Sequence, residues 1–326
     1  MDYTYANALH LGERCYKEKA AKGEDPCLPA LTKVSEKYGG VSEQALGLQE
    51  IPLELIVGTY SEGRSNAFAA NFMPLMDLST EFAGKYQALI AAHVKEGIRD
   101  PIKVYEYLHE YYVVEGNKRV SVLKLFNAVS FPGEVTRLLP ARSNDPKIQA
   151  YYEFVEFYRI APVNFLNFSN PGDYQHYLDL TGFSADHLPK EDDLRTMKGS
   201  FLRFQSAYRA QGGRELKTLT DGDAYLIFLD FYGYRETLDE GPAEIRSGLL
   251  KIWDEYILRT KKETEKVELV TAASEENKQN ILERIFVPDK FLKIAFVYEK
   301  TPETLAWTTV MSLDGSTSCR NSAARL

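Results

Sequence analysis

The sequence has few cysteines, no excess of positive charge and no long apolar segment. Its three cysteines, Cys15, Cys27 and Cys319, are odd in number and lack CxxC spacing, which argues against a disulfide framework and a cysteine-based metal site. The longest apolar runs, such as Ala224 to Leu229, are far below the roughly 18 residues of a membrane span. The N-terminus lacks a continuous apolar stretch. We therefore expect a cytoplasmic protein without a membrane span.

The charge balance argues against nucleic acid as an unaided partner. The 326 residues include 39 Lys+Arg and 47 Asp+Glu, a formal net charge of −8, whereas neutralising phosphates needs a positive surface. At roughly 150 residues per domain, the length predicts about two domains.

Hydrophobic periodicity and turn residues between residues 49 and 141 predict a compact α+β domain. We expect a strand at 51–58, a helix from Ser79–Thr80 to Gly97, a hairpin of Ile102–Leu108 and Tyr111–Gly116, a helix at Lys118–Phe126 and a strand at 134–140.

The sequence outside residues 49–141 predicts four further regions. These are a helical lead-in at 1–48, an aromatic-rich helical domain at 146–261, a charged linker and helix at 262–290, and an apolar strand with an irregular tail at 291–326. We interpret the aromatic stripes of the helical domain as core rather than as a ligand cage.

The segment Val113–Leu123 carries the main chemical signal. An apolar strand runs through Glu115 and Gly116 into a helix with Lys118 and Arg119 in its first turn. Cations there oppose the helix dipole. A bound anion would justify them, because the helix N–H groups, the glycine backbone and the arginine fork can all face it. The alternative is a surface turn with two solvated basic side chains.

These residues also carry a family resemblance. The span Ile51–Pro140 resembles the ParB/sulfiredoxin-like domain, through its IPL strand, the loop residue Arg64, Gly97 before a Pro-Ile strand, and the Gly-x-x-Arg turn of Gly116 and Arg119. The resemblance covers about 90 residues. It implies a mixed-sheet fold in which Gly116 and Arg119 bind nucleotide phosphate and Arg64 lies in a nucleotide-contacting loop.

Departures from the family narrow the activities that the resemblance implies. Sulfiredoxins have a catalytic cysteine where this chain has Asn117, so we do not expect sulfinic acid reduction. ParB proteins carry a basic DNA-binding region, whereas Ile51–Pro140 has nine Lys+Arg and ten Asp+Glu, net 9 − 10 = −1. A third branch resembles free-serine kinases, in which an acidic residue beside the motif helps to hold magnesium.

Glu115 is the candidate for that acidic residue, as a magnesium ligand and catalytic group. Its alternative role is to cap the turn or to pair with Lys118 or Arg119. Glu81 and Lys85 could act as base and phosphate clamp, or form an ordinary i,i+4 pair on a solvent face.

The loop at residues 58–68 contains Gly63 and Arg64. It either folds over the phosphates of a nucleotide or is a flexible connection. The predicted nucleotide-binding residues from this loop and from the turn before the helix are Arg64, Gly63, Gly116, Asn117, Lys118 and Arg119.

The C-terminal segment LKIAFVYEKTPETLAWTTV resembles the start of a basic-membrane-protein-type substrate-binding domain, a nucleoside-binding family. The residues that follow do not continue the resemblance, so we expect an incomplete domain from a truncated or frame-shifted longer chain.

Together these observations predict a bacterial nucleotide-binding regulatory or sensor protein that uses CTP or ATP, with magnesium. By analogy with ParB it would form a homodimer. One alternative is a small-molecule kinase or phosphohydrolase using the same pocket. Another is a non-catalytic interaction module related to transporter substrate-binding proteins.

Overall fold

A computed structural model describes residues 3–38, 42–261, 309–311 and 317–319. The chain divides into two units, residues 1–267 and 268–326. In the second unit, β6 (Thr309–Met311) and β7 (Thr317–Cys319) form a two-stranded antiparallel sheet. Apart from these strands, the predicted linker at 262–290 and the predicted incomplete substrate-binding domain at 291–326 lie outside the described residues.

The first unit contains a five-stranded mixed sheet in the order β1-β5-β3-β4-β2. Pairs β1/β5 and β3/β4 are antiparallel, and pairs β3/β5 and β2/β4 are parallel. The strands are β1 (Ser42–Pro52), β2 (Ile56–Thr59), β3 (Ile102–Tyr107), β4 (Glu110–Glu115) and β5 (Ser130–Leu139). With the helices around this sheet, the predicted α+β class is confirmed.

Helices precede, interrupt and follow the sheet. In the first half of the unit they are α1 (Tyr5–Ala21), α2 (Leu31–Glu36), the 3-10 turn η1 (Leu53–Leu55), α3 (Glu62–Ser65), α4 (Glu81–Glu96) and α5 (Asn117–Leu125). In the second half they are α6 (Pro146–Ile160), α7 (Asp173–Thr181), α8 (Glu191–Ala210), η2 (Gly213–Glu215), α9 (Asp221–Tyr232), α10 (Tyr234–Leu238) and residues 242–261. Within the described part of the chain, no helix is long and apolar enough to cross a membrane.

Local sequence signals fix several of these boundaries. The Thr80 hydroxyl accepts a hydrogen bond from Ala83 N and caps α4, and Gly97 ends that helix with φ 77°. The hairpin between β3 and β4 turns at Leu108 and His109, whose φ values are 54° and 70°. These features confirm the predicted helix start, helix stop and tight hairpin.

Strand β1 differs from the sequence expectation. It begins at Ser42, inside the lead-in predicted as helical, and the predicted strand at 51–58 is split by η1 into the end of β1 and β2. The register with β5 shifts between Ala45 and Gly47, where Gly47 has φ 75°. Such a bulge breaks the alternation of side chains, so the sequence of this strand lacks the regular pattern that predicts one.

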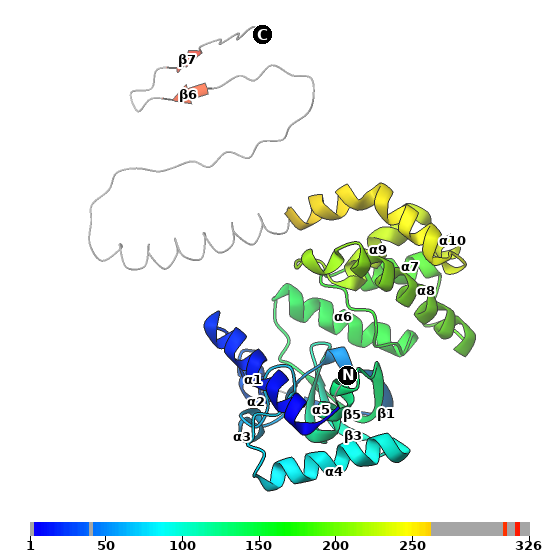
Figure 1. Cartoon of the computed structure of the whole chain (residues 1–326). Helices are drawn as coiled ribbons and strands as arrows, with labels where there is room; N and C mark the ends of the chain where they lie inside the picture. Colours follow the sequence, from blue (N-terminus) through cyan, green and yellow to red (C-terminus); the bar gives the residue numbers. More distant parts are fainter. Residues whose placement is uncertain (1–2, 39–41, 262–308, 312–316, 320–326) are drawn as a thin grey trace. The chain divides into compact units, whose positions relative to one another are not determined.

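The sheet is covered on both faces, as Figure 1 shows. Tyr107 and Tyr112 share a core with Phe154 and the helices from α6 onward. In a second core, Val120 of α5 packs on the strands, and α1 and α4 pack together beside α5 in a third. Aromatic residues of the helical region, including Phe204, are buried, which confirms the interpretation of its stripes as core.

A buried ion pair attaches α6 to the sheet. The Arg137 guanidinium donates to Glu106, and both side chains are only 2% exposed. The Tyr151 hydroxyl on α6 lies 2.9 and 3.0 Å from the two Glu106 carboxylate oxygens, and His109 N donates to the same carboxylate at 2.9 Å. Burial lowers the pKa of Arg137, but the Glu106 carboxylate together with Tyr151 and Tyr158 outweighs burial, so the net direction is upward.

Candidate functional site

The predicted phosphate turn joins β4 to α5 through a single glycine. Gly116 adopts a left-handed conformation with φ 110° and ψ 20°, and no side chain caps α5. A Cβ atom at this position would lie 2.8 Å from Ile102 Cγ2 and 3.2 Å from Arg119 Nε. Glycine is therefore required both by the backbone conformation and by close packing.

The Arg119 guanidinium is already engaged by protein groups. Its Nη1 donates to the carbonyls of Asp100 at 2.8 Å and Pro101 at 2.5 Å, and its Nη2 lies 3.2 Å from Glu115 Oε1. The side chain is 19% exposed. Arg119 thus ties the first turn of α5 to the segment that leads into β3.

The sequence left open whether Glu115 holds magnesium or pairs with a neighbouring cation, and the structure shows the pairing. Its exposed carboxylate pairs with Arg119 and lies 3.9 Å from Lys103 Nζ. Within the described part of the chain, no group of three or more His, Cys, Asp or Glu residues could hold a metal ion. The magnesium and catalytic roles of Glu115 stay predictions.

Asn117 ties the same turn to β2. Its buried side chain donates through Nδ2 to Thr59 Oγ1 at 3.2 Å, and that hydroxyl donates to Val113 O at 3.1 Å. Asn117 Oδ1 is buried and has no hydrogen-bond partner in the described part of the protein. The start of α5 is consequently held on two sides, by Asn117 and by Arg119.

A cluster of cations lies beside this turn. Burial, followed by the positive charge of Lys85, lowers the pKa of Lys118, and Arg64 lowers it further, while Glu81 opposes these effects. Lys118 Nζ lies 4.3 Å from the centre of the Phe82 ring. Arg64 reaches this region from the exposed α3, and Lys85 from α4. We call Arg64, Lys85 and Lys118 the cation cluster.

One carboxylate, that of Glu81, lies beside the cation cluster. Glu81 Oε1 lies 2.6 Å from Lys85 Nζ, and this hydrogen bond, with the nearby positive charge, lowers the pKa of Glu81. Of the predicted residues, the structure therefore gathers Arg64 and Lys118 with Lys85 and Glu81. It places Glu115 and Arg119 in a separate pair, and Gly63 in the exposed turn of Arg64.

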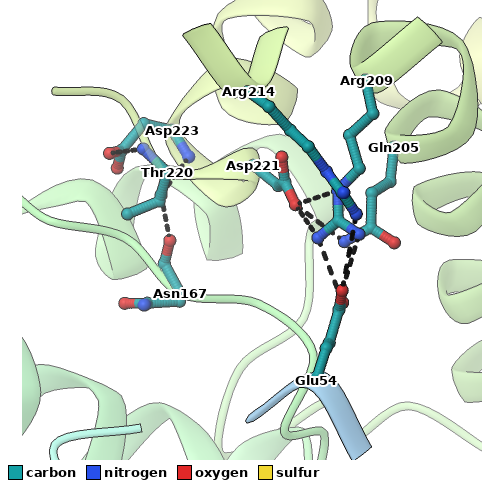
Figure 2. Close-up of polar contacts among 8 residues, drawn as sticks. All are labelled: Glu54, Asn167, Gln205, Arg209, Arg214, Thr220, Asp221 and Asp223. Atoms are coloured by element: carbon teal, nitrogen blue, oxygen red, sulfur yellow. Dashed lines mark hydrogen bonds and ion pairs between the residues drawn. The ribbon is translucent and has the colours of Figure 1, made fainter. Parts of the chain in front are cut away.

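Sequence reasoning missed a polar network that joins α8 and α9 to η1. Arg209 of α8 contacts Glu54 in η1 and Asp221 in α9, as Figure 2 shows. The sequence T-D-G-D at Thr220–Asp223 is a capping signal for α9, and it could have placed Asp221 at a helix start. Nothing local pointed to Glu54, which lies 155 positions from Arg209.

No protein-family model matches the chain, and the search of curated proteins found no significant match. Among solved structures, the chain is similar to the C-terminally truncated chromosome-partitioning protein ParB from Caulobacter crescentus, crystallised with CTP-γ-S. The match has 14% sequence identity and a TM-score of 0.20, and covers 55% of this chain and 97% of that chain. A TM-score this low gives no basis for transferring a fold or a ligand. The family resemblance thus rests on the sequence motifs.

Proposed function

We propose that this protein binds the phosphate groups of a nucleotide at the start of α5 and acts as a nucleotide-dependent regulator. The observation that carries the proposal is the cation cluster beside a helix start without a side-chain cap, where burial, followed by the positive charges of Lys85 and Arg64, lowers the pKa of Lys118. Glu81 pairs with Lys85, so the positive charges of Arg64 and Lys118 remain for a bound anion to offset. First-turn N–H groups and the helix dipole favour an anion at the same place.

Arg119 and Asn117 have positioning roles in this proposal. They fix the glycine turn to the β3 and β2 sides, so that the first turn of α5 is held before a ligand arrives. A site that is already ordered loses less conformational entropy on binding. The phosphate itself is held by Lys118, Arg64 and Lys85, with CTP or ATP as the proposed nucleotide and magnesium on its phosphate oxygens.

A phosphotransferase is the second candidate, and Glu81 is the observation that bears on it. A carboxylate beside a phosphate site could remove a proton from an acceptor hydroxyl. However, the lowered pKa of Glu81 makes its carboxylate a weaker base. This geometry favours binding over transfer, so regulation is the leading proposal.

Nucleotide titration of the full chain by calorimetry tests the proposal. We expect CTP or ATP to bind, with affinity that falls as salt rises. The Lys118→Ala variant should lose about tenfold in affinity, because a hydrogen bond to a charged group contributes roughly 1.5–3 kcal/mol.

Lys95→Ala is the matched control, since Lys95 is an exposed lysine in the last turn of α4. Its affinity should equal that of the unmodified chain. Failure of every nucleotide to bind, or equal losses in both lysine variants, would contradict the phosphate site. Turnover that requires a small hydroxyl substrate and disappears in Glu81→Gln would establish the phosphotransferase instead.

A further inference from the structure

A cavity of about 540 Å³ lies between the sheet and the helical region, and none of the cation cluster lines it. One side is formed by η1 and by the loop between α5 and β5, and the other by α8 and the start of α9. Small-molecule sites typically occupy roughly 300–1,000 Å³ and often lie between structural layers. The cavity therefore has the size and the position of a ligand site.

Its polar wall is organised by Arg209 (Figure 2). The two terminal nitrogens of Arg209 bind the Glu54 carboxylate at 2.7 and 3.0 Å, and its Nε donates to Asp221 Oδ2 at 2.8 Å. Gln205 Nε2 donates to the same Asp221 oxygen at 2.9 Å. These contacts leave acceptor capacity on both carboxylates, because each ionised carboxylate can accept about four hydrogen bonds.

The neighbouring wall is held rigidly. The Thr220 hydroxyl donates to the backbone carbonyl of Asn167 at 2.5 Å, and a Cβ on Gly222 would lie 2.3 Å from that oxygen. The Asn167 side-chain amide has no hydrogen-bond partner among the described residues. A fixed backbone therefore holds Asn167, one of the residues that line the cavity, in place before a ligand arrives, which reduces the entropy lost on binding.

The remaining wall is apolar and partly open. Phe165 and Phe201 have ring centres 5.3 Å apart, and Leu202 beside them is 46% exposed. The charged lining residues are Glu50, Glu54 and Asp221 against Lys198 and Arg209. Three carboxylates against two cations leave no excess positive charge for a phosphate, so this wall suits an uncharged ligand.

We propose that this cavity binds a ring-shaped, uncharged molecule with adjacent hydroxyl groups, either a free monosaccharide or the ribose of a nucleoside. Adjacent hydroxyls can donate to the carboxylates of Glu54 and Asp221 and exchange hydrogen bonds with the Asn167 amide. The C–H face of the ring then packs on the apolar wall. This site is independent of the phosphate site proposed at α5.

Calorimetry on the full chain with D-ribose, D-glucose, cytidine, adenosine and 2′,3′-dideoxycytidine tests the proposal. Binding of a monosaccharide identifies free sugar as the ligand source. Binding of a ribonucleoside, with a loss of at least tenfold for the dideoxy compound, identifies ribose, because a site that bonds hydroxyls rejects an analogue without them. No binding by any compound, or equal binding of cytidine and its dideoxy analogue, overturns the proposal.

Two variants locate the binding. Asn167→Ala removes the amide but keeps the backbone carbonyl that Thr220 uses, and we expect roughly tenfold weaker binding. Leu202→Trp fills the partly exposed side of the cavity and should abolish binding without unfolding the chain, as checked by circular dichroism. Lys118→Ala should leave this binding unchanged. If neither cavity variant weakens binding, or if Lys118→Ala weakens it equally, the ligand does not occupy this cavity.

Discussion

Two ion-pair networks join the helices to the sheet, and they differ in burial. Glu106 and Arg137, beneath α6, have side chains that are 2% exposed. Glu54, which binds Arg209 of α8, has a side chain that is 47% exposed. A buried charge that loses its partner stays uncompensated, whereas a partly hydrated one regains water. We therefore expect the loss of a carboxylate to cost more in the network of Glu106 than in that of Glu54.

The largest effect should follow from Glu106→Gln. The substitution leaves the Arg137 guanidinium buried without its carboxylate, so the free energy of unfolding should fall by about 3–5 kcal/mol. Urea denaturation of the full chain measures this loss. Glu54→Gln is the matched control in the other network. Equal losses in the two variants would show that burial does not distinguish the networks.

Acid should lower the free energy of unfolding through His109, which lies beside the buried network of Glu106 and Arg137. The imidazole ring centre lies 4.3 Å from that of Phe154, and burial, followed by the positive charge of Arg137, lowers the pKa of His109 to about 3. The folded state keeps this ring neutral, whereas the unfolded chain takes up a proton below about pH 6.5. This contribution to stability is complete above pH 6.5 and is lost as the pH falls toward 3.

Between pH 7 and pH 5, the free energy of unfolding should fall by about 2 kcal/mol because of His109, as the linkage relation gives. His109→Asn should remove this part of the acid sensitivity, because asparagine tolerates the left-handed backbone at this position. Urea denaturation of both proteins at the two pH values gives the comparison. Identical pH dependence in the two proteins would mean that His109 is protonated in the folded state.

The smallest effect belongs to the exposed network. Glu54→Gln should reduce the free energy of unfolding by no more than about 1 kcal/mol, given the exposure of the pair. Raising NaCl from about 0.05 M to about 0.5 M should shrink this difference further, since screening acts on hydrated charges. The loss caused by Glu106→Gln should barely change with salt. A salt-independent effect at Glu54 would place that pair among the buried ones.

The sequence predicted those parts of the fold that local signals determine. Thr80 and Gly97 mark the ends of α4, and the strand-to-helix junction at Gly116 was located within one residue. These positions depend on capping and on backbone conformation, which neighbouring residues specify. The α+β class followed from the order of such elements.

The sequence could not predict which groups the charged side chains would meet. The sequence predicts that Arg119 binds phosphate, but it gave no sign that Arg119 Nη1 also donates to the carbonyls of Asp100 and Pro101. That outcome depends on the path of the chain before β3. Likewise, Glu106 meets Arg137 across two paired strands, 31 positions away. Long-range pairs of this kind come from tertiary packing.

The bulge at Gly47 lies in β1, the outer strand of the sheet. In the described sheet β1 has a partner only in β5, so its other edge offers unpaired backbone groups to a strand from another molecule. The positive φ of Gly47 and the shifted register bend that edge away from the flat geometry that intermolecular pairing needs. A β-branched residue at position 47 would favour a straighter edge and promote fibrous self-association in concentrated solution.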